Sequence, residues 1–388
     1  MKRILSLVAA VLAAGMLTAQ ETTTSTPSPR LDDGVRLLAH VPKEIDGCLW
    51  LNLQELMSHP FVAEQIEKEK GKVQSDLLRI QELFAKHGLD LYQSFQGALM
   101  FGSRDSGGAL LLQTKMPEAR FRQMFTEENP DNNVSLVDGH SVYSFAGKEP
   151  DPGQAANPTN SRQRRRVFGQ DGKSVAMYLR PNVIISAPDL DALQAYRESI
   201  KTSGTFVANS ALAGFRRRVA PDSVAWAVFV NPQPEQGQPQ QNPLNSVRGG
   251  SLSLHFGLKD NEQQKDDLRL VLRLACPDAQ KASFAAMQVN GLMVLGVGQA
   301  FKDNPNLAME VSQLLQFRPV QQDLVLDATV TKDLFNRLKT AIEDLKNKQP
   351  GGLPAGGTGL PPTGGNGRGN DDVGLAPLPT PIPPPPAP

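Results

Sequence analysis

Two stretches of the chain share one arrangement of apolar and polar residues. Each starts with Val and Pro, passes an acidic or polar bend, and then runs apolar through a tryptophan to an asparagine, at 41–52 and 219–231. Trp50 and Trp226 are the only tryptophans in the sequence. An apolar run bounded by turn residues is typical of a buried strand, so we predict that each stretch is the first strand of a similar half. The second run is apolar at both alternating sets of positions, which predicts a central strand covered on both faces.

Shorter runs predict the remaining elements. Apolar runs separated by Gly, Asn, Asp or Pro favour antiparallel hairpins, and apolar side chains at three- and four-residue steps favour helices. We predict strands at 96–102, 109–114, 133–137, 141–145, 174–179, 182–186, 251–258, 267–274, 317–320 and 324–330. We predict helices at 60–88, 117–126, 188–201, 209–218, 277–301, 306–315 and 331–346.

The elements follow similar orders in the two halves. Each half has a tryptophan strand, a hairpin, a helix that starts on Pro, further strands and a closing helix. The sequence therefore predicts an α+β fold of two diverged tandem units, an internal repeat with mainly antiparallel sheets and covering helices. The second half has a Pro/Gln/Gly loop at 232–243 where the first has helix 60–88. We predict a signal peptide at 1–19, a Thr/Ser/Pro linker at 20–34, the units at 35–204 and 205–348, and a disordered Pro/Gly-rich tail at 349–388.

The first residues predict export. Lys2 and Arg3 precede an apolar run over 4–17, and Ala19 is followed by polar residues, as in a secretory signal peptide cleaved after Ala19. The run is shorter than the roughly 20 residues of a membrane anchor, the alternative. Cleavage reduces 40 basic residues to 38 and leaves 40 acidic residues, a net charge of −2. We therefore expect a periplasmic or extracellular protein, with neither nucleic acid nor, after cleavage, a membrane as its partner.

The chain has two cysteines, Cys48 and Cys276. They are too few for a disulfide scaffold, and a chain of this length does not need one. In an oxidising compartment the two could form one disulfide. The alternative is a pair of buried free thiols.

No motif specifies a chemistry. Gly172-Lys173-Ser174 lacks the upstream glycine of a phosphate loop, because position 167 is Val. Gly291, Gly296 and Gly298 lie inside a predicted helix, where small residues are expected to let that helix pack closely. The five histidines are scattered, and paired acids occur in linkers, turns or the tail. We therefore expect no catalytic, cofactor-binding or metal-binding residues and no cofactor.

Two runs of arginine are candidates for a basic patch that binds a partner. An acidic polysaccharide or lipid headgroups would suit such a patch, whereas solvated side chains on a loop and a short helix are the alternative. Aromatic residues do not alternate with these arginines, as they do in proteins that bind single-stranded nucleic acid. The residues are Arg162, Arg164, Arg165, Arg166, Arg216, Arg217 and Arg218.

Three segments carry a resemblance to other proteins: 221–226 (PDSVAW), 304–308 (NPNLA) and 323–330 (DLVLDATV). Together with the signal peptide and the tail, they resemble a broad group of uncharacterised secreted bacterial proteins with paired α+β units. The resemblance covers most of 35–348 and implies no site residues, because none are established for that group.

These observations favour an exported, non-catalytic module of the cell envelope or extracellular space that binds a protein or polysaccharide partner. One alternative is an extracytoplasmic enzyme whose site is assembled from scattered residues. Another is a carrier that holds an apolar ligand between the sheets.

Overall fold

A computed structural model describes residues 32–59, 62, 82, 84–103, 107–128, 134–145, 174–220, 222–231, 246–257 and 267–348. The chain divides into two compact units, Met1–Lys339 and Thr340–Pro388. The predicted signal peptide, the tail and most of the linker, of helix 60–88 and of loop 232–243 lie outside the described residues. The predicted domain boundaries stay predictions.

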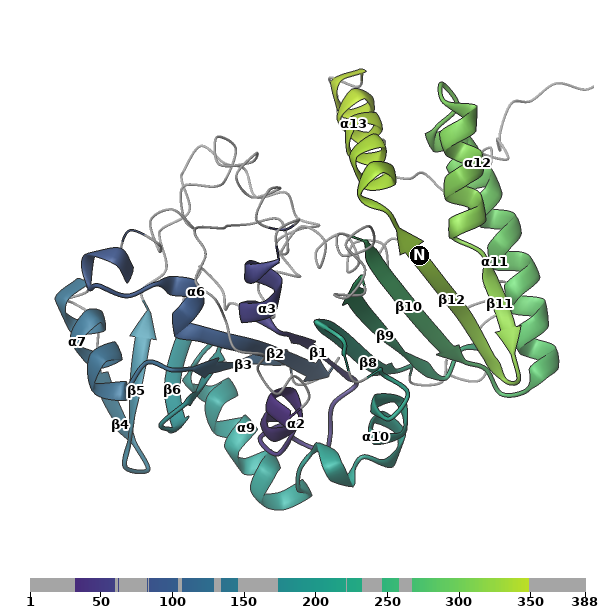
Figure 1. The fold of residues 1–388 in the computed structure, drawn as a ribbon. Coiled ribbons are helices and arrows are strands. Elements are labelled where there is room, and N and C mark those ends of the chain that lie inside the picture. The colour runs from purple at the N-terminus through teal and green to yellow at the C-terminus, as the bar shows by residue number, and fades with distance from the viewer. Residues whose placement is uncertain are drawn as a thin grey trace, which may run out of the picture. The chain divides into compact units, whose positions relative to one another are not determined.

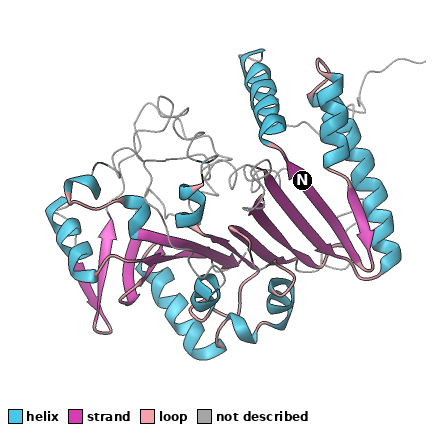
Figure 2. Ribbon diagram, in the orientation of Figure 1, coloured by secondary structure: helices cyan, strands magenta, loops and turns pink. Residues whose placement is uncertain are grey.

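The described strands of the first unit form one 12-stranded antiparallel sheet (Figure 1, Figure 2). Its order is β11-β12-β10-β9-β8-β1-β2-β3-β7-β6-β5-β4. This sheet and the helices beside it confirm the predicted α+β class. The strands are β1 (Gly47–Leu51), β2 (Phe95–Ser103), β3 (Gly107–Thr114), β4 (Val134–Val137), β5 (His140–Phe145), β6 (Ser174–Arg180), β7 (Val183–Ala187), β8 (Ala225–Val230), β9 (Gly249–Phe256), β10 (Leu268–Ala275), β11 (Phe317–Val320) and β12 (Asp323–Val330).

The two halves of the sheet meet at the tryptophan strands. β1 pairs antiparallel with β8, and Trp50 lies directly opposite Trp226. Outward from this pair the first half runs β1-β2-β3-β7-β6 and the second runs β8-β9-β10-β12-β11, with the hairpin β4–β5 added to the first. The halves therefore share a strand order, while their origin as an internal repeat stays a prediction.

Helices lie on both faces of the sheet. One face packs with α2 (Asp32–Leu38), α9 (Leu190–Ser203) and α10 (Ser210–Arg216) in the largest core cluster, which contains both tryptophans. On the other face α7 (Glu118–Glu128), α3 (Leu53–Ser58) and α11 (Ala279–Ala300) contribute to separate clusters. The remaining helical segments are α6 (Leu91–Ser94), η2 (Phe206–Ala208), α12 (Pro305–Leu314) and α13 (Lys332–Lys348).

Strand β8 is central and covered on both faces, as its apolar pattern predicts. Trp226 and Val228 are buried in the cluster of α2, α9 and α10. Ala225 and Ala227 are buried in two clusters on the opposite face. Alternating side chains of a strand point to opposite faces, so a strand without polar positions requires two cores.

Local turn chemistry also follows the sequence at the β4–β5 hairpin. Asp138 and Gly139 have φ of 48° and 81°, the left-handed conformation that a two-residue hairpin turn requires at both positions.

The prediction that the glycines of α11 let this helix pack closely is wrong in the described part of the chain. Gly291, Gly296 and Gly298 are exposed, and a Cβ built on each would meet no described atom within 4 Å.

Candidate functional site

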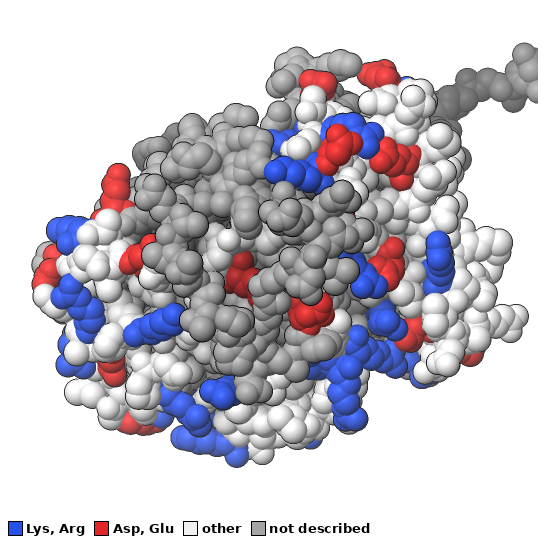
Figure 3. Space-filling view, viewed as in Figure 1, with Lys and Arg blue, Asp and Glu red and all other residues white. Residues whose placement is uncertain are grey.

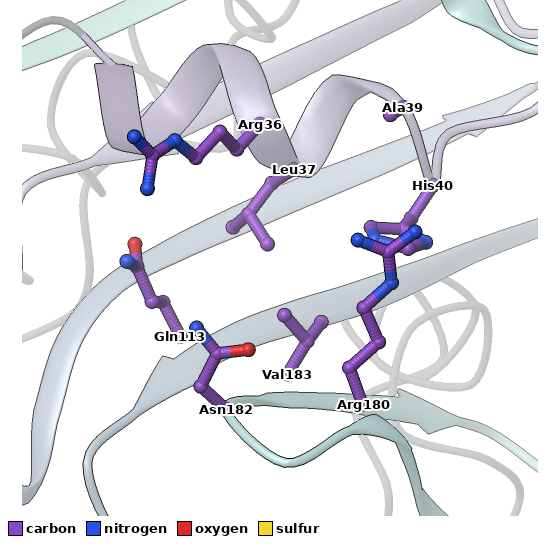
Figure 4. A pocket seen from close by; sticks show the side chains of 8 residues that line it. All are labelled: Arg36, Leu37, Ala39, His40, Gln113, Arg180, Asn182 and Val183. Carbon is purple, nitrogen blue, oxygen red and sulfur yellow. The ribbon is translucent and has the colours of Figure 1, made fainter.

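A pocket of about 320 Å³ opens beside α2, at the β3–β7 pair and the turn between β6 and β7. Its size is at the lower end of the range for small-molecule sites, roughly 300 Å³ upward. Leucine, alanine and valine side chains make its apolar surface, and arginine, histidine and amide side chains make its polar surface. The lining residues are Arg36, Leu37, Ala39, His40, Gln113, Arg180, Asn182 and Val183 (Figure 4).

Helix α2 is positioned by its apolar side. Leu37 and Leu38 are 2% and 4% exposed and belong to the core cluster shared with α9. The helix ends in a turn whose His40 carbonyl accepts a 2.5 Å hydrogen bond from the hydroxyl of Tyr196 on α9. Burial of the two leucines leaves Arg36 on the exposed side of the helix, and the bond to Tyr196 fixes the backbone at His40.

The opposite side of the pocket is set by strand pairing. Gln113 on β3 lies opposite Val183 on β7. The backbone N–H of Thr114 donates to the carbonyl of Asn182 at 2.9 Å, which fixes the turn after β6. Arg180 is the last residue of β6, next to a register shift against β7, so its side chain reaches the pocket from the strand end.

The described lining of the pocket carries positive charge. Two guanidinium groups line it, and no acidic side chain is among the described residues that do. Figure 4 shows the Arg180 guanidinium beside the His40 ring, and the Gln113 amide directed toward Arg36. Burial, and secondarily the positive charge of Arg180, lower the pKa of His40 below its usual value. His40 is therefore neutral at pH 7, and the two arginines carry the charge.

Gln113 carries a buried acceptor without a partner. The residue is 7% exposed, and its Oε1 has no hydrogen-bond partner among the described residues. A buried polar atom without a partner costs about 1–3 kcal/mol. A ligand that gives its negative charge to the arginines and a hydroxyl hydrogen to Oε1 would remove that cost. The polar groups therefore fit a carboxylate that carries hydroxyl groups.

A second, shallower groove lies between α7 and the β4–β5 turn. Its cation is already paired within the chain: Arg122 donates to Ser141 and lies 3.9 Å from Glu118. Because charges of both signs line this groove, it offers no preference for an anion or a cation. It is the weaker candidate.

A third group has the atoms of a hydrolytic triad. Ser253 Oγ lies 3.0 Å from His255 Nε2, and His255 Nδ1 lies 3.2 Å from Asp222 Oδ1. Ser253 and His255 are two apart on β9, so their side chains share one face of the sheet. This order of contacts is the one that activates a serine nucleophile.

The surroundings of this group do not suit hydrolysis. Ser253 is 4% exposed and lies directly opposite Trp226 on one neighbouring strand and Val271 on the other. Strand β9 is paired on both sides, so its backbone N–H groups are engaged in the ladders and cannot form an oxyanion hole. The same face carries an ion pair between Arg269 and Asp327, at 2.7 and 2.9 Å. We therefore interpret Ser253, His255 and Asp222 as a structural hydrogen-bond network.

The arginines of the predicted patch have different surroundings. Arg162, Arg164, Arg165 and Arg166 lie outside the described residues. Arg216 places its guanidinium 4.4 Å from the centre of the Trp226 ring, and Nη1 of Arg218 donates to both carboxylate oxygens of Asp323 at 2.8 Å. Arg217 is exposed. Two of the three described arginines are thus engaged within the chain, and the patch as a whole stays a prediction.

The cysteines are free thiols. Both are buried, Cys48 in the cluster with the tryptophans and Cys276 in the cluster with α11 on the opposite face. Burial raises the pKa of Cys48 to about 12. In the structure the two cysteines are therefore buried free thiols, the alternative stated in the sequence analysis, and no disulfide joins them.

Sequence reasoning missed every residue of the pocket. Its members come from three regions more than 60 residues apart, and none forms a motif. The serine and histidine of the network did leave a signal: Ser251, Ser253 and His255 alternate with apolar residues along β9. Such alternation on a buried strand indicates polar side chains that need partners.

The described residues contain neither a metal-binding cluster nor a membrane-spanning helix. No group of three or more His, Cys, Asp or Glu side chains is placed to hold a metal ion. No described helix has the length and apolar character needed to cross a membrane.

Comparison with known proteins does not assign the chain to a family. No family model and no curated protein matches it. Among solved structures it is similar to crystal form III of TP0453, with a TM-score of 0.40 and 10% identity over 83% of this chain and 100% of that one. Crystal form IV gives 0.38 and 10% over 79% and 95%, and form I gives 0.35 and 11% over 83% and 98%. Similarity at this level does not establish a common fold or function.

Proposed function

We propose that the chain is an exported, non-catalytic module that binds a polymer partner through a hydroxylated carboxylate held in the pocket beside α2. Export rests on the predicted signal peptide. The binding role rests on one observation: two arginines line a pocket whose described lining also includes Gln113, the residue with the unsatisfied Oε1. An acidic polysaccharide offers the matching groups, because each uronic acid residue has a carboxylate beside hydroxyl groups.

The apolar surface of the pocket supports the same ligand. Leu37 and Val183 are 2% and 5% exposed, and their side chains lie between the two arginines in Figure 4. A sugar ring has one face of C–H groups that can pack against such side chains, while its carboxylate and hydroxyls bond at the rim. The pocket accounts for one residue of a polymer, and the remainder would continue across the surface.

The alternatives have less support. The described strands form one sheet, so the described part of the chain has no space between two sheets for an apolar ligand. A scattered enzyme site would have its best support in Ser253, His255 and Asp222, but burial of Ser253 and His255 opposes it.

The experiment is isothermal titration with tri-galacturonate, its methyl ester and inorganic phosphate. We expect the acid to bind and the neutral ester not to bind at the same concentrations. Arg180→Ala removes one guanidinium, and a charge-assisted hydrogen bond to a partly exposed arginine contributes about 1.4 kcal/mol, or tenfold in Kd.

Arg217→Ala is the matched control, because it removes the same charge from the predicted basic patch and leaves the pocket intact. Unchanged affinity is expected for this variant. Loss of binding in Arg217→Ala but not in Arg180→Ala would move the site to the patch. Equal binding of acid and ester would rule out recognition of a carboxylate, and binding of phosphate alone would rule out the hydroxylated ligand.

A further inference from the structure

Helix α11 has an apolar stripe that faces solvent. Its buried side consists of small residues, and its other side exposes Phe284, Met287, Val294 and Leu295 at 54%, 66%, 55% and 66%. Within α11 the only charged residue is Lys281, near its start. In Figure 3 the surface at the right, where Figure 1 places α11 and α12, is mostly white. A surface helix normally carries charged side chains there, so this stripe is an unpartnered apolar face.

The spacing of the stripe is that of a helix–helix seam. Phe284, Met287, Gly291, Val294 and Gly298 follow one another at steps of three, four, three and four. These steps are the a and d positions of a heptad repeat, which face a second helix in a coiled coil. A helix packed only on its own sheet does not need this spacing on its outer face.

The area of the face agrees with a protein interface. Leu292 flanks the stripe at 50% exposed, and Met309 of the neighbouring α12 is 59% exposed. At about 100 Å² for each half-exposed large side chain, these six side chains together expose about 600 Å² of apolar surface. That is the upper end of the largest apolar patch on an ordinary monomer, and two such faces together reach about 1,200 Å², the lower limit of a stable interface.

The stripe is complementary to itself when two copies run antiparallel. A two-fold axis at Gly291 places Phe284 opposite Gly298, Met287 opposite Leu295 and Val294 opposite Gln288 of the second copy. The largest side chain then faces the smallest, and the two Gly291 residues allow the backbones to approach. A parallel pair would instead set phenylalanine against phenylalanine and glycine against glycine. Without charges on the stripe, two identical faces do not repel one another.

We propose that this chain forms a two-fold homodimer through antiparallel pairing of α11 with α11 of a second copy, centred on Gly291. The proposal also gives a role to the glycines. Glycine destabilises a helix interior relative to alanine, and a Cβ built on Gly291 or Gly298 would meet no described atom within 4 Å beyond the neighbouring backbone of α11. In the dimer they form the surface against which the second helix packs.

Sedimentation velocity of the full chain from 1 to 200 µM tests the proposal. The wild type is expected to show a monomer–dimer equilibrium within this range, because the interface is near the minimum size. Met287→Asp places a charge in the seam and should raise the dimer Kd at least 100-fold. The matched control is Leu136→Asp, which alters a residue 78% exposed on the edge strand β4 and should leave the equilibrium unchanged.

A cysteine pair tests the geometry without destabilising the fold. Gly291→Cys lies on the proposed axis and should form an intermolecular disulfide under mild oxidation, because a disulfide needs Cα atoms about 4.4–6.8 Å apart. Gly296→Cys is equally exposed on the same helix but off the stripe, and should not. The native cysteines are buried and do not compete.

Several results would overturn the proposal. A wild type that stays monomeric at 200 µM excludes the dimer. If that monomer binds phosphatidylcholine vesicles, the apolar face of α11 is a lipid-binding surface instead. Dissociation by Leu136→Asp alone would assign association to the sheet edge. Equal crosslinking of the two cysteine variants, or none in either, would exclude the axis at Gly291.

Discussion

Replacing Gly97 with alanine should destabilise the protein strongly through one contact. A Cβ built on Gly97 would lie 1.8 Å from Cη2 of Trp50, 2.5 Å from Cζ3 and 2.6 Å from Cζ2. All three distances are shorter than the van der Waals contact distance between two carbon atoms, so the indole ring would have to move. Gly97 does not have a positive φ, so alanine fits its backbone conformation and the cost comes from the ring alone.

The indole has little room to move. Trp50 is 3% exposed, and a Cβ built on Gly34 of α2 would lie 3.1–3.2 Å from three other atoms of the ring. Overpacking a rigid core costs about 1–3 kcal/mol, and a contact this short places Gly97→Ala near 3 kcal/mol. Against a total stability of about 5–15 kcal/mol, the variant should remain folded with a lower midpoint of unfolding.

Urea unfolding followed by circular dichroism and tryptophan fluorescence measures this cost. Trp50→Phe shortens the ring, so Gly97→Ala should cost at least 1 kcal/mol less in that background, a coupling typical of residues in contact. Gly214→Ala is the control, because α10 has space there and alanine favours a helix by roughly 0.5–1 kcal/mol. A Gly97→Ala variant within 0.5 kcal/mol of wild type, or costs that add without coupling, would refute the packing of Trp50 between two glycines.

Three further predictions follow from the same structure. Burial and the positive charge of Arg180 lower the pKa of His40, so the imidazole is neutral at pH 7 and gains a positive charge only as the pH falls through this lowered pKa. Tri-galacturonate should therefore bind more tightly at the acidic end of a pH series than at pH 7; a flat profile, or the same profile in His40→Asn, would contradict this. Ser253→Ala should lower the free energy of unfolding by about 1 kcal/mol, the net value of a buried hydrogen bond. Ser253 of the wild type should not react with a fluorophosphonate probe. Covalent attachment of the probe to Ser253 would instead show that this serine is a nucleophile. The hydrogen bond from Arg269 lowers the pKa of Asp327 in the folded protein. The ion pair therefore stabilises the fold at pH values above the unfolded pKa of an aspartate, about 3.9. This contribution disappears as the pH falls through the lower pKa of the folded state. Asp327→Asn should therefore lower the free energy of unfolding by about 0.5 kcal/mol at pH 7, as expected for an exposed pair, and should not change it at pH 2. An equal loss at both pH values would exclude the ion pair as its source.

Local structure was largely predictable because local signals specify it. Asp138-Gly139 predicted a tight turn, and both residues adopt the left-handed backbone that such a turn needs. The predicted starts of α11 and α12 lie within two residues of the observed ones, where Asp278 caps α11 and Pro305 is the first residue of α12. Side-chain caps and fixed proline φ act over one helical turn, so sequence reasoning can reach them.

Long-range arrangement was less accessible. The tryptophan strands were predicted as equivalent first strands, but their direct pairing, which joins both halves into one sheet, depends on two segments 176 residues apart. Helix α2 begins at Asp32, inside the segment predicted as linker. Only two leucines anchor it to the core, too short a pattern to show helical periodicity.

The candidate site could not be predicted from sequence at all. Arg36, Gln113 and Arg180 have no spacing in common, and their meeting depends on strand order, on the turn after β6 and on the anchoring of α2. A lone glutamine in an apolar strand gives no sign that its Oε1 will lack a partner. Sites built from single residues of distant elements become visible only in three dimensions.

Side-chain NMR during titration with tri-galacturonate tests the central claim most directly, because it reports where the carboxylate binds. The Gln113 amide and the Arg180 Nε–H signals should shift together and saturate with the Kd measured by calorimetry, since both groups line the pocket. The Nε–H signal of exposed Arg217 should stay in place. Shifts at Arg217 with none at Gln113 or Arg180 would show that the ligand binds elsewhere and that the pocket is not the binding site.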